Sequence, residues 1–311
     1  MSQLITIPQT DLKVHPLCLG GNVFGWSASE AESFEVLDAY VAAGGNFIDT
    51  ADVYSEWKTG NSGGESETII GNWMKARGNR SQIVIATKVA KYSKRPGLSA
   101  ENIRSAAQDS LRRLQTDYID LYYAHEDDPK VSMVETLGTF NELVTQGKVR
   151  YLGASNFNSI RLREALQTSE ESGFAKYSVI QNQYNLLDRK PYETDMAPTL
   201  KEFGITSLPF YGLARGFLTG KYREGVSVNS VRAGGVADYQ NRRGWKTLAA
   251  LTDIATVRQV SLAAVALGWL RGQESVSTPI ASARTVEQLR EIMPVVELSS
   301  RELESLSAIT A

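Results

Sequence analysis

The chain has 311 residues, 42% of them hydrophobic, which is ample for one large core or for two smaller domains. Lysine and arginine (33) nearly balance aspartate and glutamate (35), which argues against a protein that binds nucleic acid or an anionic membrane. No signal-peptide pattern, membrane-length apolar run or cysteine pair is present, so we expect a cytoplasmic protein without an internal disulfide.

The first two thirds of the chain alternate short apolar runs with segments of helical period. Residues 4–16 are expected to form a β-hairpin that closes the bottom of a barrel. Seven candidate strands then end at Gly20, Asp49, Lys88, His125, Asn156, Gln181 and Phe210. Amphipathic helices are expected between them, for example over residues 101–114 and 132–146, the latter with Val134 on its apolar face and a cap at Gly147. Strand ends roughly 25–40 residues apart indicate parallel βα units.

The last third adds an eighth strand at residues 277–282 and a helix that begins near Thr285. The interval between Phe210 and Pro279 has room for more than one helix, and residues 225–240, rich in Gly, Ser and Val, are expected to be a mobile loop. No linker divides the chain. We therefore predict one domain over residues 1–311, a (β/α)8 TIM barrel with an N-terminal β-hairpin and extra C-terminal helices.

Polar side chains close several of these apolar strands. They are Asp49, Lys88, His125, Asn156 and Gln181, with Tyr54 in the loop that follows the second strand. In a (β/α)8 barrel these positions meet at one rim, and buried charges there must pair. We expect the Lys88 ammonium to lower the pKa of Tyr54, Asp49 to keep Lys88 charged, and His125 to bind a substrate oxygen. Any one of these side chains alone has an ordinary structural explanation, and two histidines with one cysteine predict no metal site.

The words that carry these residues, FIDTADVY, IVIATK and YIDLYYAH, resemble the aldo-keto reductase family in sequence and in order. GASNF, IQNQYN, LARGFLTGKY and PIASARTVEQL extend the resemblance over nearly the whole chain. It implies that Asp49, Tyr54, Lys88 and His125 form a catalytic tetrad. It also implies NADPH-dependent, reversible hydride transfer between nicotinamide and an aldehyde, a ketone or the corresponding alcohol, with Tyr54 exchanging the proton.

The same resemblance implies a set of residues that bind the cofactor. They are Gly21, Asn22, Asp49, Ser155, Asn156, Gln181, Phe210, Tyr211, Gly212, Leu213, Arg215, Gly216, Ser282, Arg284 and Gln288. Asn156 and Gln181 would hold the nicotinamide carboxamide, Phe210 would stack on its ring, and Arg284 would bind the 2′-phosphate of NADP. Many relatives carry Glu-Asn near the adenine where this chain has Glu291 and Ile292, so NAD is kept as an alternative cofactor.

Trp26, Trp57, Tyr92 and His125 are expected to line the mouth where a small carbonyl or alcohol substrate enters. Two other functions stay open. A Schiff-base lyase could use Lys88 as its nucleophile, and some members of the resembling family act as nicotinamide-binding regulatory subunits of potassium channels with little turnover. The sequence does not specify the substrate, the direction of reaction or a homo-oligomeric state.

Overall fold

The core of the computed structural model, which describes residues 3–225 and 233–310, is an eight-stranded parallel sheet. The strands are β3 (Cys18–Gly20), β4 (Phe47–Asp49), β5 (Val84–Val89), β6 (Ile119–Ala124), β7 (Val149–Ser155), β8 (Tyr177–Gln181), β9 (Thr206–Ser207) and β10 (Ile280–Ala281). They pair in the order β10-β3-β4-β5-β6-β7-β8-β9. A parallel bridge from Ser207 to Val276 and a hydrogen bond from Ile280 N to Pro209 O (2.9 Å) join the two outer strands. The sheet therefore closes on itself, which confirms the predicted barrel.

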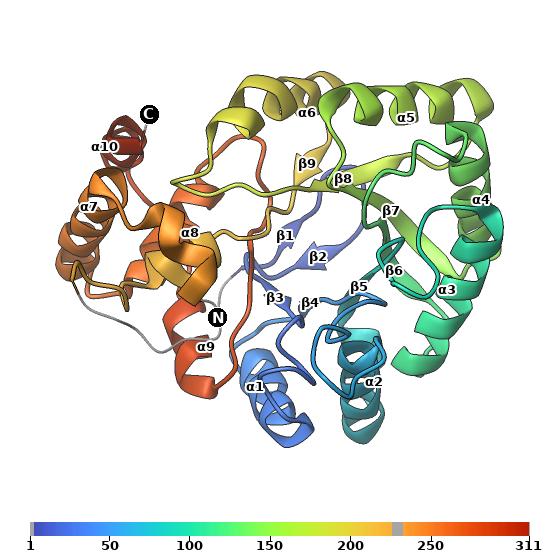
Figure 1. Ribbon diagram of the computed structural model, residues 1–311, viewed down its shortest axis with the longest axis horizontal. Helices are drawn as coiled ribbons and strands as arrows, with labels where there is room; N and C mark the ends of the chain where they lie inside the picture. Colours follow the sequence, from blue (N-terminus) through green and yellow to red (C-terminus); the bar gives the residue numbers. More distant parts are fainter. Residues whose placement is uncertain (1–2, 226–232, 311) are drawn as a thin grey trace.

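Helices surround the sheet and connect its strands (Figure 1). They are α1 (Glu30–Ala42), α2 (Glu65–Arg77), η1 (Arg80–Gln82), α3 (Ala100–Leu114), α4 (Met133–Thr145), α5 (Ser159–Ser172), η2 (Tyr192–Met196), α6 (Ala197–Phe203), α8 (Leu262–Arg271) and α9 (Val286–Ile292). Serine N-caps at Ser29, Ser99 and Ser132 accept backbone N–H groups of the first helical turn, which fixes where α1, α3 and α4 begin. Because the eight strands are all parallel, their carboxyl ends meet at one end of the barrel.

An antiparallel hairpin of β1 (Ile5–Thr6) and β2 (Lys13–Val14) precedes the barrel, as predicted. Ile7, Leu12 and Val14 are buried in one apolar cluster with interior barrel residues such as Phe47 and Leu121. Because these contacts fill the end where the strands begin, solvent reaches the barrel interior from the opposite end, where the strands finish.

Three sequence predictions differ from the structure. Val134 is 55% exposed, because Met133, Leu137 and Phe140 form the buried face of α4 instead. β9 ends at Ser207, short of Phe210, although Phe210 still donates its N–H to Asn182 O (3.1 Å) and forms an isolated parallel bridge with Gln183. Within the expected mobile loop at 225–240, residues 226–232 lie outside the described residues, whereas η4 (Ala233–Tyr239) is a 3-10 helix.

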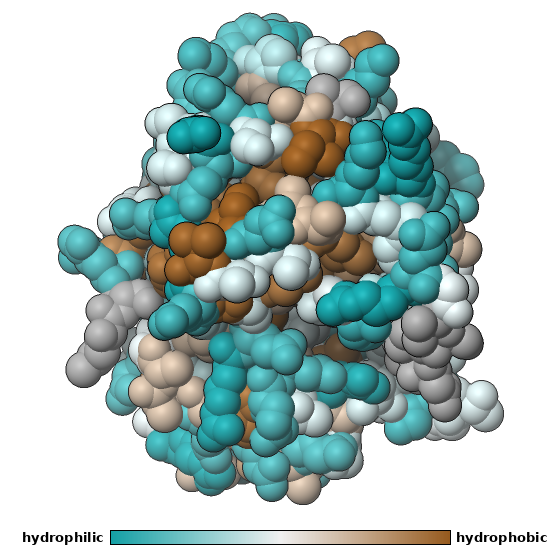
Figure 2. Space-filling model, turned by 90° about the vertical axis from the view of Figure 1, so that its left-hand side faces the viewer, coloured by the Kyte–Doolittle hydropathy of each residue, from teal (hydrophilic) through white to brown (hydrophobic). Residues whose placement is uncertain are grey.

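The predicted extra C-terminal helices are present as α7 (Arg242–Arg258) and α10 (Ser300–Thr310), preceded by the short η3 (Ala214–Thr219). Apolar side chains gather across this side of the molecule (Figure 2), and Val257 of α7 is 83% exposed. Across residues 3–225 and 233–310, no single helix is long and apolar enough to cross a membrane; α7 and α8 pass that test only together, bent by 98°.

Candidate functional site

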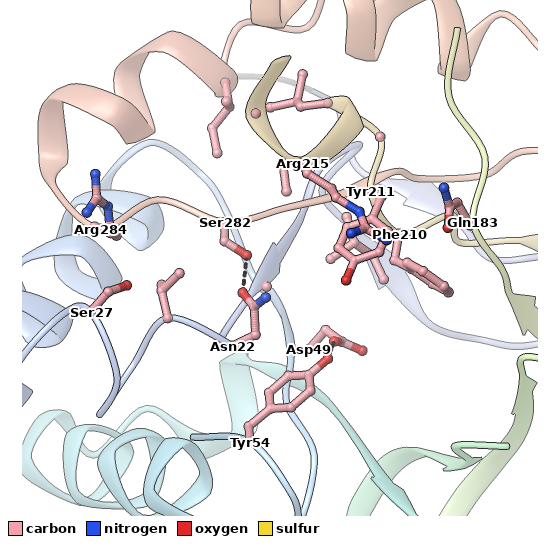
Figure 3. A pocket seen from close by; sticks show the side chains of 18 of the residues that line it. Asn22, Ser27, Asp49, Tyr54, Gln183, Phe210, Tyr211, Arg215, Ser282 and Arg284 are labelled. Atoms are coloured by element: carbon pink, nitrogen blue, oxygen red, sulfur yellow. Dashed lines mark hydrogen bonds between the residues drawn. The ribbon is translucent and has the colours of Figure 1, made fainter. Parts of the chain in front are cut away.

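A cavity of about 1030 Å³ opens at the carboxyl ends of the strands. Of the predicted catalytic, cofactor-binding and substrate-binding residues, it is lined by Asn22, Asp49, Tyr54, Trp57, His125, Ser155, Asn156, Gln181, Phe210, Tyr211, Gly212, Leu213, Arg215, Gly216, Ser282, Arg284 and Gln288. In Figure 3, Arg284 and Ser27 lie toward one end of the pocket and Gln183 toward the other, with Tyr54 and Asp49 at its floor. The cavity is therefore elongated, and its two ends differ chemically.

A buried ion pair lies at the cavity floor. The Lys88 ammonium donates to Asp49 Oδ2 (2.6 Å), to the Thr50 carbonyl (2.7 Å) and to Tyr54 Oη (3.2 Å). The Tyr54 hydroxyl in turn donates to Asp49 Oδ2 (3.2 Å). All three of the ammonium's hydrogen atoms therefore have an acceptor, which is what a buried lysine requires.

Neighbouring backbone contacts fix these three side chains. Asp49 and Lys88 lie on the paired strands β4 and β5, and Thr50 N extends that pairing with a hydrogen bond to Ala86 O (2.8 Å). Tyr54 follows in a turn closed by its own N–H to Ala51 O (3.2 Å). Asp49 is the last residue of β4 and Tyr54 is the last residue of the turn that follows, which explains why they are five residues apart.

The pKa of Tyr54 lies well above its usual value of 10, because the hydroxyl is buried and the Asp49 carboxylate is close. The sequence predicted the opposite direction, from the Lys88 ammonium. That ammonium contacts the hydroxyl, but burial and Asp49 outweigh it in this structure. Burial also lowers the pKa of Lys88 from 10.5, with Asp49 opposing. Tyr54 therefore carries its proton at neutral pH.

His125 lies directly after β6 and packs edge-on against Tyr54, with ring centroids 6.0 Å apart. Its backbone N donates to Val89 O (2.8 Å), which extends the pairing of β5 and β6 by one residue. The buried Nδ1 atom has no partner within the structure. Burial, reinforced by the Lys88 and Lys91 charges, holds the pKa of this imidazole well below 6.5. The ring is therefore neutral at physiological pH.

Gln181 and Asn156 line the cavity and also contact residues of the predicted tetrad. The Gln181 amide donates to Asp49 Oδ1 (2.9 Å), so both carboxylate oxygens of Asp49 are hydrogen-bonded. The Asn156 amide donates to the His125 carbonyl (2.8 Å), and Asn156 itself has a positive φ of 57°. Their contact with a carboxamide remains a prediction.

The wall opposite Asp49 and Tyr54 follows β9. Tyr211 and Arg215 both have positive φ (54° and 57°), and the Arg215 guanidinium lies 4.7 Å from the centre of the Tyr211 ring. The Asn185 amide donates to the Tyr211 carbonyl (3.0 Å). One oxygen of Asp188 accepts from Gln183 (2.8 Å), Asn185 (2.9 Å) and Tyr239 (2.6 Å), which ties η4 to this wall.

The far end of the cavity follows β3 and β10. Ser282 Oγ donates to Asn22 Oδ1 (2.7 Å, Figure 3), and Arg284 N donates to the Gln288 side chain (3.0 Å) at the start of α9. A Cβ on Gly20 would lie 2.6 Å from Ser282 Oγ, so a larger residue there would displace this hydroxyl. Backbone and polar side chains thus border this end.

Gly21, Trp26 and Tyr92 do not line the cavity. Gly20 does so in place of Gly21, Trp26 packs behind Trp57 (5.6 Å between centroids), and Tyr92 packs against Gly63. The residues that the sequence prediction missed are Gly20, Val23, Ser27, Val53, Lys91, Gln183, Thr219, Gly220, Lys221, Ile280 and Ala281. Most of them are sequence neighbours of predicted residues, so including one or two residues on each side of the predicted positions would have found them. Glu291 and Ile292, which the sequence comparison placed near the adenine, also line the cavity.

A second buried ionic cluster supports the segment between Asp49 and Tyr54. Asp52 and Glu67 are both buried, and Arg113 pairs with Glu67 (2.6 Å). Burial and the neighbouring Glu67 charge raise the pKa of Asp52 to about 8. Asp52 is therefore largely protonated at neutral pH. The Arg113 guanidinium then has only one buried negative charge to neutralise, that of Glu67.

Comparison with known proteins gives a consistent result over the whole chain. The model of the Aldo/keto reductase family matches residues 16–311. Protein tas of Escherichia coli is 34% identical, with 91% of this chain and 90% of that protein covered. Norsolorinic acid reductase B of Aspergillus parasiticus is 34% identical (94% and 79% covered), as is the putative aryl-alcohol dehydrogenase AAD14 of Saccharomyces cerevisiae (96% and 84%).

The depressed pKa of His125 can be tested directly, because the chain has two histidines. We expect the His125 ring signals in NMR to stay at their neutral positions from about pH 8 to about pH 6, where an exposed histidine is more than half protonated. His15→Gln assigns the signals. As the pH falls below 6.5, the unfolded chain takes up protons that the folded chain does not, so stability should decrease. A His125 midpoint at 6.5 or higher would contradict this assignment.

Proposed function

Because the chain belongs to the aldo/keto reductase family, we propose that it catalyses reversible hydride transfer between NADPH and an aldehyde or ketone, or the corresponding alcohol. The observation that carries the proposal is the contact of Lys88 with both Asp49 and Tyr54, beside His125, at the floor of the cavity. Relatives whose names describe them as reductases or dehydrogenases support the oxidoreductase class.

The cavity fits an elongated, anionic dinucleotide. Two buried polar atoms of lining residues, Ser27 Oγ and Arg215 Nε, have no partner within the structure and would gain one from a ligand. Cationic Arg284 lies toward the end of the pocket opposite Gln183, where phosphate groups would be held (Figure 3). Phe210, Asn156 and Gln181 border the catalytic end and would hold the nicotinamide, which supplies or accepts the hydride when bound.

The reaction also requires a proton for the carbonyl oxygen, and side chains of this protein can supply it. Tyr54 would donate to the carbonyl oxygen in reduction and take the proton back in oxidation. Lys88, already in contact with Tyr54 Oη, would stabilise the phenolate that forms, and Asp49 holds Lys88 in place. Neutral His125 has an N–H group that can donate to the same carbonyl oxygen, which orients the substrate.

We infer a preference for NADP over NAD from Arg284, whose backbone N is fixed by the Gln288 side chain (3.0 Å). A planar guanidinium at this end of the cavity suits a 2′-phosphate. Nearby Glu291 and Ile292 also line the cavity, and neither side chain has an N–H group to donate to adenine, so NAD is kept as the weaker alternative.

The Schiff-base lyase gains no support from the site. An amine nucleophile must be deprotonated and reach its substrate, whereas Lys88 is buried and donates three hydrogen bonds. A regulatory nicotinamide-binding protein would use the same cavity, and it differs from an enzyme in turnover. One relative is named as a putative aryl-alcohol dehydrogenase, and we propose aromatic alcohols or aldehydes as substrates of this chain too.

Tyr54→Phe tests the proton donor. We expect the turnover of benzaldehyde with NADPH to fall by roughly 10²–10⁴-fold, since a positioned acid contributes that much. The NADPH dissociation constant, measured by fluorescence titration, should change less than about twofold because the ring remains. Tyr151→Phe, on the far side of the barrel, serves as the matched control. Near-normal turnover in Tyr54→Phe would remove the assignment.

Arg284→Ala tests the cofactor preference. The dissociation constant for NADPH should rise about tenfold or more and that for NADH by less than about twofold, because only NADPH carries the 2′-phosphate. Arg290→Ala changes an exposed residue of α9, the helix that follows Arg284, and should affect neither dissociation constant. Equal losses for both nucleotides would contradict the assigned contact.

A further inference from the structure

Lys91 is a cationic side chain that lines the catalytic end of the cavity without belonging to the tetrad. It lies two residues after β5, and the hydrogen bond from His125 N to Val89 O brings this segment beside the end of β6. Its ammonium is 3.6 Å from the Glu126 carboxylate, with the two side chains 34% and 45% exposed. Ion pairs this open are weak, so the ammonium can bind a further anion.

The backbone that carries Lys91 is anchored on both sides. Gly97 N donates to the Ala90 carbonyl (2.8 Å), and Ser93 N donates to Glu56 Oε2 (3.3 Å), with a second hydrogen bond from the Ser93 hydroxyl to the same carboxylate. Glu56 immediately precedes Trp57. The segment with Lys91 is thus fastened to the aromatic wall of the cavity.

That wall presents aromatic surface beside the proposed proton donor. Trp57 lines the cavity and is 50% exposed, although it packs edge-on against Tyr54 (6.0 Å, 63°) and Trp26 (5.6 Å, 86°). Large aromatic side chains gain free energy when a planar apolar group covers them. An aromatic substrate ring placed against Trp57 would leave its carbonyl group near Tyr54.

Lys91 is separate from the cations suited to a dinucleotide. Among the described residues that line the cavity, Arg215 and Lys221 follow β9, and Arg284 follows β10. Lys91 follows β5, on the wall that carries His125, and its charge is one of the causes that lower the pKa of His125. An anion bound by Lys91 would therefore belong to the substrate.

We propose that the substrate is an aromatic aldehyde or ketone that carries a carboxylate, with its ring beside Trp57 and its carboxylate on Lys91. This inference rests on the proposed reductase function and specifies its substrate class. Lys91 touches neither the carbonyl group nor Tyr54, so it determines specificity through binding. Its removal should raise KM and leave kcat nearly unchanged.

The experiment compares charged and neutral aldehydes of similar size with the full chain and NADPH. The probes are 3- and 4-carboxybenzaldehyde and their methyl esters. We expect at least one acid to be reduced with a kcat/KM about tenfold higher than its ester, and Lys91→Met to abolish that preference through KM. The preference should also decrease as ionic strength rises, because the site is partly open to solvent.

Two further variants separate this role from a purely structural one. Lys94→Met, an exposed lysine on the same loop, should keep the preference intact. Glu126→Gln removes the carboxylate that competes for Lys91, so it should increase kcat/KM for the acid several-fold and leave the ester unchanged. A merely structural ion pair predicts no gain in that variant.

The outcomes distinguish the two proposals. If the esters and benzaldehyde are reduced but the acids are no better, or if Lys91→Met slows acid and ester alike, the substrate inference is overturned while the reductase function stands. If no aldehyde oxidises NADPH, although the chain binds the nucleotide, both are overturned.

Discussion

The ion pair between Lys88 and Asp49 is the constraint on which the site depends. Both side chains are buried in the barrel, and removing one partner of such a pair typically costs about 3–5 kcal/mol. The pair persists because the barrel supplies the remaining hydrogen bonds: Lys88 donates to the Thr50 carbonyl, and the Gln181 amide donates to Asp49. Adjacent strands hold the two charges at 2.6 Å, and the turn after Asp49 places Tyr54 in contact with both.

Much of this arrangement could be predicted from the sequence, because strand ends in a barrel meet at one rim. Apolar runs that finish in Asp49, Lys88 or His125 gave the strands and the polar floor together, and the structure brings these residues into contact. Local signals also sufficed to predict where helices end. Ser132 caps the start of α4, and Gly147, just beyond the other end of this helix, has a positive φ of 70°. Such features depend on few neighbours, which are close in sequence.

Features that depend on tertiary surroundings could not be predicted. The rise in the pKa of Tyr54 requires knowledge of how deeply the hydroxyl is buried, and the bond from Gln181 to Asp49 joins strands far apart in the chain. The directions of loop side chains were equally hidden, as Tyr92 packs away from the cavity while Lys91, one residue earlier, lines it. Neighbouring loop residues differ in direction because contacts with other segments fix them.

In the proposed mechanism, Lys88 acts in catalysis through the Tyr54 hydroxyl. A double-mutant cycle tests this most directly: the rate of carbonyl reduction is measured for Lys88→Met, Tyr54→Phe and the double variant. The Tm of each variant checks that it is folded. If Lys88 acts through the Tyr54 hydroxyl, the double variant should be no slower than Tyr54→Phe alone. Losses that multiply independently in the double variant would contradict the account, because they would mean that the ammonium and the phenol act on separate steps.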